Sequence, residues 1–118
     1  MIKIKYKQYV IVPKRPRMSK GKIASQVAHA TFMALEKQKN KKLIQKWKEE
    51  GMCVIVLQTK DALRLFGISK YLEQWGIPNH VYIDEGITEV DFGTPTALAT
   101  GILEEEQFWI FKTSRLFK

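Results

Sequence analysis

The chain has little cysteine and no long apolar segment, and each shortage excludes a class of protein. Cys53 is the single cysteine among 118 residues, which excludes an intramolecular disulfide framework and a zinc site built from several cysteines. No apolar run reaches the roughly 20 residues that a bilayer-spanning helix needs. The first eight residues, MIKIKYKQ, alternate lysine with apolar side chains and lack a signal-peptide core. We therefore expect a cytoplasmic protein without a membrane partner, in which Cys53 is a buried thiol.

Internal repeats, low-complexity segments and linkers are also missing. A length of 118 residues suits one hydrophobic core rather than two, so we expect a single domain over residues 1–118. Apolar residues make up 45% of the chain, a proportion typical of globular proteins, which argues against disorder.

Acidic residues are scarce in the first half of the chain. Residues 1–50 hold 14 Lys or Arg and 3 Asp or Glu, whereas residues 51–118 hold 6 and 9. The net charge of +8 is therefore concentrated at one end, a pattern that favours a polyanionic partner, most often nucleic acid. A lysine-rich solvated surface is the alternative.

Residues 18–35, MSKGKIASQVAHATFMAL, have the pattern of a helix that begins after Ser19. A serine at this position accepts hydrogen bonds from free N–H groups of the first turn. Apolar and small residues recur at helical spacing, while Lys22, Gln26 and His29 share a polar stripe. A lysine near a helix N-terminus is unfavourable unless an anion lies nearby. Lys22 is thus either a solvated surface lysine or the partner of an anion, and we expect His29 to be packed and hydrogen-bonded.

A short basic loop, PKRPRM, precedes this helix at residues 13–18. Five cations lie within nine residues, beside a helix N-terminus, where they can form a rim that binds phosphate groups. Solvated loop side chains are the alternative. The five are Lys14, Arg15, Arg17, Lys20 and Lys22; the first three are called the loop cations below.

Strand and helix patterns alternate along the chain, which predicts an α/β layered sheet. The predicted strands lie at residues 1–12, 52–57, 81–83 and 95–101, and the predicted helices at 18–35, 43–50, 62–75 and 103–111. The third and fourth strands are joined by about a dozen residues without a helix pattern, so we expect them to be antiparallel and the sheet to be mixed. The loop that carries Lys22 and the loop that begins at Asp84 are expected to meet at the strand ends.

Two segments, MSKGKIASQVAHA at residues 18–30 and DEGITEV with GTPT at residues 84–90 and 93–96, together resemble the archaeal and eukaryotic class (type 2) of peptidyl-tRNA hydrolase. Residues 18–30, MSKGKIASQVAHA, follow the family pattern (M/L)-x-(K/R)-G-K-(I/L)-A-x-Q-x-(A/S)-H-A almost throughout. Residues 84–90, DEGITEV, and 93–96, GTPT, match a second family motif. The resemblance implies a three-layer αβα sandwich around a four-stranded mixed sheet. It also implies hydrolysis of the ester that joins a peptide to the terminal ribose of tRNA, with no metal and no cofactor.

The resemblance further implies which residues form the site. Lys22, Asp84 and Thr88 fall on positions associated with catalysis: Asp84 would orient or deprotonate a water that Thr88 holds, and Lys22 would neutralise the oxyanion or a terminal phosphate. The positions expected to bind the substrate are Arg17, Lys20, Gln26, Gly86, Thr94 and Thr96. tRNA is the expected partner, and a homodimer is compatible with the sequence.

The chain also departs from the family pattern. Glu85 places a second carboxylate beside the proposed base, where the family has a small residue. The basic loop replaces the family's mixed-charge segment, and the C-terminal Gly-x-Leu-x-Leu is replaced by SRLFK. These departures leave a non-catalytic or differently specific RNA-binding protein, or a protein-interaction module with the same fold, as alternatives to an active hydrolase.

Overall fold

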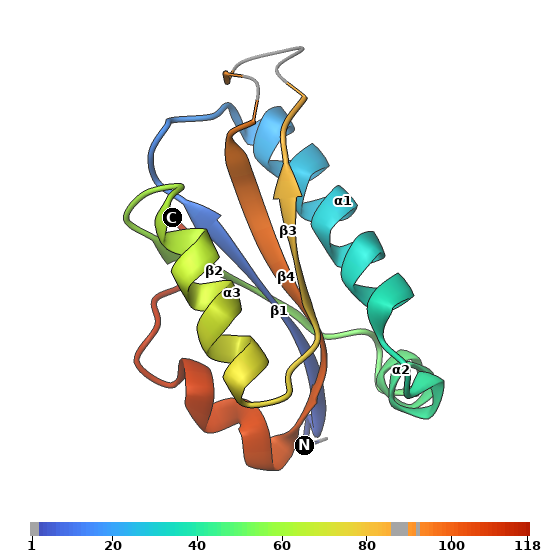
Figure 1. Ribbon diagram of the computed structural model, residues 1–118. Coiled ribbons are helices and arrows are strands. Elements are labelled where there is room, and N and C mark those ends of the chain that lie inside the picture. Colours follow the sequence, from blue (N-terminus) through green and yellow to red (C-terminus); the bar gives the residue numbers. More distant parts are fainter. Residues whose placement is uncertain (1–2, 86–89, 92) are drawn as a thin grey trace.

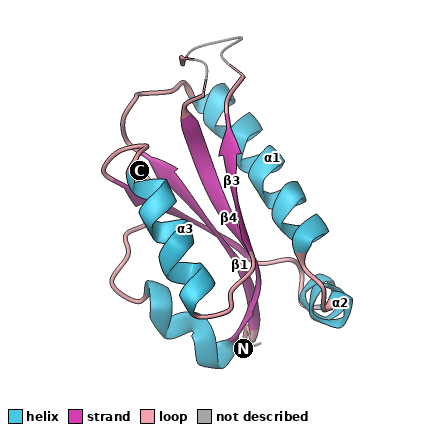
Figure 2. Cartoon of the chain, in the orientation of Figure 1, coloured by secondary structure: helices cyan, strands magenta, loops and turns pink. Residues whose placement is uncertain are grey.

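The computed structural model describes residues 3–85, 90–91 and 93–118, which form helices packed on one mixed sheet (Figures 1 and 2). The strands pair in the order β2-β1-β4-β3; β1 is parallel to β2, and β4 is antiparallel to both of its neighbours. The elements are β1 (Tyr6–Pro13), α1 (Lys20–Lys37), α2 (Lys41–Glu49), β2 (Val54–Thr59), α3 (Arg64–Gln74), β3 (Asn79–Ile83), β4 (Pro95–Glu104) and the 3-10 helix η1 (Glu105–Phe111).

The helices lie on both faces of the sheet, which confirms the three-layer αβα arrangement (Figure 1). Successive residues of β1 point to opposite faces, as the pleat requires. Tyr9 and Ile11 pack against the face that carries α3 and η1, whereas Val10 and Val12 pack against the face that carries α1. Because each face has an apolar layer over it, β1 is apolar without alternation, and it lies inside the sheet as its sequence predicts.

Helix α1 begins and ends where local sequence dictates. The Ser19 hydroxyl accepts a hydrogen bond from the Lys22 N–H at 3.2 Å and caps the first turn. Helix α1 is separated from α2 by residues 38–40 in the lysine-rich segment 37–42, and Asn40 caps α2 through its side-chain oxygen. Gly51 follows α2 with φ of +99°, a conformation that glycine adopts without steric cost.

Three sequence expectations are corrected by the packing. Strand β4 continues past residue 101 to Glu104, because Ile102 and Leu103 pair with β1. The helix expected at 103–111 therefore starts later and is a 3-10 helix. Cys53 is half-buried rather than buried, since it lies in the turn before β2.

Among the described residues, no helix has the length and apolar character of a membrane span.

The last residues run along the outer edge of β2. The Gln58 N–H donates to the Arg115 carbonyl at 2.9 Å, and the Phe117 N–H donates to the Val56 carbonyl at 2.9 Å. Leu57 and Leu116 form an antiparallel bridge between these two hydrogen bonds. The tail is thus extended, and it covers the edge that β2 would otherwise present to solvent.

Candidate active site

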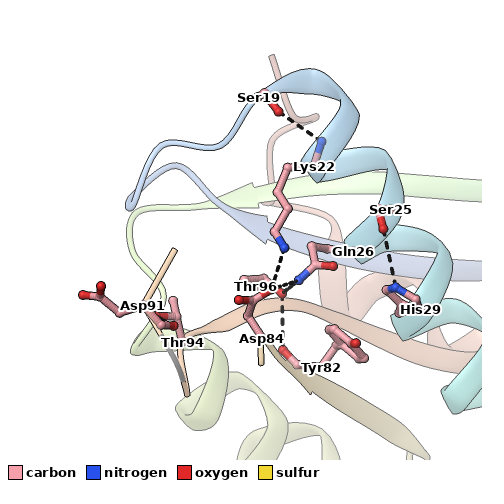
Figure 3. A network of polar contacts seen from close by, with 10 residues as sticks. All are labelled: Ser19, Lys22, Ser25, Gln26, His29, Tyr82, Asp84, Asp91, Thr94 and Thr96. Atoms are coloured by element: carbon pink, nitrogen blue, oxygen red, sulfur yellow. Dashed lines mark hydrogen bonds and ion pairs between the residues drawn. The ribbon is translucent and has the colours of Figure 1, made fainter. Parts of the chain in front are cut away.

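A nearly buried ion pair joins the first turn of α1 to the end of β3 (Figure 3). Lys22 Nζ lies 2.6 Å from Asp84 Oδ1, and the two side chains are 10% and 5% exposed. Water is largely excluded from both groups, so the attraction between them is much stronger than between two surface charges. The two residues that the sequence placed at neighbouring strand ends therefore meet directly.

An amide and a hydroxyl complete the polar network around Asp84. Gln26, one turn along α1 from Lys22, donates from Nε2 to Asp84 Oδ1 at 3.0 Å and to Thr96 Oγ1 at 2.7 Å. Thr96 in turn lies 3.5 Å from the Tyr82 carbonyl (Figure 3). Both hydrogens of the Gln26 amide are used, which holds its NH2 group toward the carboxylate. Gln26 and Thr96 are 2% and 0% exposed, so they stand behind the ion pair, away from solvent.

Small residues allow α1 to approach the sheet closely enough for these contacts. Ala30 and Ala34 on α1 are fully buried and pack in one cluster with Ala97 and Ala99 on β4. Larger side chains at this layer would move the helix away from the sheet, because protein interiors are close-packed. The alanine stripe of α1 thus determines whether Lys22 and Gln26 can reach Asp84.

Asp84 is the anion that the position of Lys22 in the first turn of α1 requires. The first turn of α1 contains Lys20 and Lys22 and no acidic residue, although the N-terminus of a helix carries partial positive charge. Asp84 supplies the negative charge that Lys22 needs. Lys20 is exposed, so a substrate phosphate can approach it together with the helix N-terminus.

The backbone of Asp84 is held by the residues just before β4. Its N–H donates to the Thr94 carbonyl at 2.8 Å, and its carbonyl accepts from the Gly93 N–H at 2.9 Å. The Thr94 hydroxyl donates to the Asp91 carbonyl at 2.7 Å and closes a turn of its own. Of the other residues predicted for the site, Gly86 and Thr88 lie outside the described residues.

His29 lies on the same face of α1, one turn beyond Gln26. Its ring stacks on Tyr82, with centroids 4.6 Å apart, and its Nε2 is 3.4 Å from the Ser25 hydroxyl. The packing and the polar contact agree with expectation, but the residue is exposed. Sequence reasoning did not single out Tyr82, because its ring contact with His29 comes from the packing of α1 on β3.

A groove of about 750 Å³ lies beside the N-terminus of α1. Arg17 and Lys20, both predicted to bind substrate, line it and are exposed. Ile23, which follows Lys22 in the first turns of the helix, also lines the groove. Lys118 enters the lining from the other end of the chain, which no sequence pattern indicated.

Comparisons with known proteins identify the family to which the sequence is similar. The sequence model of a family described as Peptidyl-tRNA hydrolase PTH2 matches residues 6–111. A peptidyl-tRNA hydrolase of Thermococcus onnurineus is 39% identical over 104 residues, which cover 86% of this chain and 88% of that protein. One of Methanopyrus kandleri is 35% identical over 103 residues, covering 86% and 89%. One of Thermoplasma acidophilum is 37% identical over 103 residues, covering 86% and 88%.

The chain belongs to this family of peptidyl-tRNA hydrolases. The resemblance inferred from the two motifs is therefore confirmed. Both motifs, with Lys22 and Asp84, lie inside the range matched by the family, whereas residues 112–118 lie beyond it. Among the described residues, no group of three or more His, Cys, Asp or Glu side chains is placed to hold a metal ion.

Proposed function

We propose that this member of the family hydrolyses the ester bond of peptidyl-tRNA with Lys22 and Asp84 as its catalytic residues. The observation that carries the proposal is their 2.6 Å ion pair, formed across 62 residues of sequence next to a basic groove. An ester hydrolase needs a positioned water, a stabilised oxyanion and a binding surface for the rest of its substrate. The ion pair and the groove supply groups suited to each task.

In the proposed reaction, water attacks the ester carbonyl carbon and transfers its proton to Asp84. The resulting oxyanion is stabilised by the ammonium group of Lys22, which is worth more in a site with little water than in bulk solvent. The bond between the carbonyl carbon and the ribose oxygen then breaks. The ribose oxygen takes the proton from Asp84, and the products are tRNA with a free hydroxyl and a peptide with a free carboxyl group.

Gln26 and Thr96 act as positioning residues in this proposal. Because both are almost fully buried, they act through Asp84 rather than by contact with the substrate. The Gln26 amide holds Asp84 Oδ1 while Thr96 holds Gln26, so the carboxylate keeps one orientation as Lys22 engages the substrate. Thr88, proposed to hold the attacking water, retains that role from the family motif.

The groove at residues 13–20 is proposed to bind the 3′ end of tRNA. The loop cations and Lys20 line it and are exposed, and phosphate contacts made by such residues dominate the affinity of proteins for nucleic acids. A cytoplasmic location, where translation supplies the substrate, belongs to the same proposal. A homodimer stays a prediction, which analytical ultracentrifugation of the purified protein would test.

The direct test is hydrolysis of an N-acetylated aminoacyl-tRNA by the purified protein. We expect release of the N-acetyl amino acid by the wild type, at rates reduced together with tRNA affinity in Lys22→Ala, because a cation at the 3′ end contributes to ground-state binding as well as to the transition state. tRNA binding without turnover by the wild type would end the catalytic proposal.

A further inference from the structure

We infer that a second basic surface, made of Lys60 and Arg115, binds phosphates of the tRNA acceptor stem beyond the 3′ end. The inference rests on the proposed function, because the acceptor stem belongs to the same tRNA whose 3′ end is proposed to bind in the groove beside α1. Its evidence is a cavity of about 450 Å³ on the other flank of the basic loop.

The basic loop lies between the two cavities and contributes to the lining of both. Lys14 and Arg15 line the groove beside α1 and also the second cavity. From the loop, the groove extends to Lys20 and Ile23 on α1, whereas the second cavity extends to Lys60 and Arg115. A nucleic acid that follows the loop from α1 therefore passes from the proposed ester site to the second cavity.

Backbone hydrogen bonds fix these segments against one another. The Lys14 N–H donates to the Thr59 carbonyl and the Ala62 N–H donates to the Arg15 carbonyl, each at 2.9 Å. The loop after β1 is thereby attached to the loop after β2, at the carboxyl ends of two parallel strands. Ligands of α/β sheets commonly bind at such strand ends.

The tail brings Arg115 to this position. Phe117 packs among the residues between α1 and the sheet, and the Lys14 ammonium lies 4.6 Å from the centre of its ring. Together with the Gln58 to Arg115 hydrogen bond, this holds the tail beside the basic loop. Arg115 and Phe117 lie beyond residues 6–111, so this part of the surface is not a feature of the matched family range.

The charge of this surface is engaged within the chain at Lys14, whose Nζ donates to the main-chain oxygen of Lys118, whereas Lys60 and Arg115 have no described Asp or Glu beside them in the cavity. Neither cavity has a described Asp or Glu in its lining. Asp61, next to Lys60 in sequence, is directed to Arg64, with 3.7 Å between Oδ2 and Nε. Lys60 and Arg115 are both exposed. Clustered cations of this kind attract phosphates and release counterions when nucleic acid binds.

The test separates binding of the stem from chemistry at the ester. The variant is Lys60→Ala/Arg115→Ala, and the substrates are a full N-acetylated aminoacyl-tRNA and a CCA trinucleotide with the same ester. For tRNA, we expect the enzyme concentration at half-maximal single-turnover rate to rise roughly tenfold at 0.1 M salt, with an unchanged maximal rate. The slope of log affinity against log salt should fall by about 2, or about 1 for each lost cation. The trinucleotide should be hydrolysed as by the wild type.

A matched control removes two lysines from another surface. Lys42 and Lys48 lie on α2, are exposed, and line neither basic cavity. Lys42→Ala/Lys48→Ala should leave tRNA affinity and its salt slope within twofold of the wild type.

Two results would overturn the inference: unchanged tRNA affinity in Lys60→Ala/Arg115→Ala, or an equal loss on both substrates. A wild type that binds tRNA without hydrolysis would contradict the proposed function alone, because the salt series still measures the contribution of this surface to binding.

Discussion

Asp84→Asn removes one charge from the site and keeps the shape of the side chain. The asparagine oxygen can still accept hydrogen bonds from Lys22 and Gln26, which lie 2.6 Å and 3.0 Å from Oδ1 in the native chain. What disappears is the proton acceptor and the counter-charge of Lys22. We expect hydrolysis to slow by roughly 100-fold or more, which is typical for loss of a positioned base, while tRNA affinity stays nearly intact.

The same change should destabilise the fold. Removal of one partner from a buried ion pair typically costs about 3–5 kcal/mol, since the other charge is left without compensation. Lys22 and Asp84 are 10% and 5% exposed, so solvent screens this loss only slightly. We expect a reduction of the free energy of unfolding within this range, measured by urea denaturation at neutral pH.

A double variant separates the two effects. Lys22→Met/Asp84→Asn removes both charges and keeps the volume of the lysine stem, so most of the lost stability should return. The double variant should hydrolyse the substrate no faster than Asp84→Asn, because neither the base nor the oxyanion partner is present. Single-turnover hydrolysis at saturating enzyme, with both proteins folded at the assay temperature, makes the comparison independent of their abundance.

Either of two results would refute this reasoning. Hydrolysis by Asp84→Asn within about threefold of the wild type, far from the 100-fold loss expected of a base, would show that Asp84 is not the proton acceptor. Recovery of the rate together with stability in the double variant would show that the ion pair serves the fold alone.

Further predictions concern the loop, Glu85 and His80. Replacing the three loop cations with alanine should weaken tRNA binding and flatten its salt dependence, because they line the groove; an unchanged slope in a filter-binding series would place the binding surface elsewhere. If the Glu85 carboxylate converges on Asp84, Glu85→Ala should raise activity near neutral pH or shift the pH–rate profile to lower pH, because two neighbouring carboxylates disfavour each other's charged form; an identical profile would contradict this. Burial, with a smaller effect of Lys37, lowers the pKa of His80 below its ordinary value of 6.5. The folded chain therefore favours neutral His80, and this contribution to the free energy of unfolding is present above about pH 6.5 and is lost as the pH falls through the folded-state pKa. His80→Gln should make urea denaturation less pH-dependent in that acidic range. An unchanged dependence would assign the acid sensitivity to other groups.

Local sequence determined the order of the helices and strands and the ends of α1, whereas the end of β4 followed from its pairing with β1. The uninterrupted apolar run of β1, the Ser19 cap and the break at Asn40 each depend on residues within a few positions of one another, so their patterns could be interpreted without the fold. The same holds for Lys22, whose place in the first turn of a helix called for an anion nearby. The two motifs then indicated Asp84 as a candidate.

Only the tertiary structure decided how closely these residues meet and what surrounds them. The Lys22–Asp84 distance depends on the alanine layer between α1 and β4, and the role of Gln26 depends on Thr96, 70 residues away. Arg115 gave no signal in sequence, because its place beside the basic loop follows from pairing of the tail with β2. Such contacts join segments far apart in the chain, and strand order and packing, rather than any local pattern, bring them together.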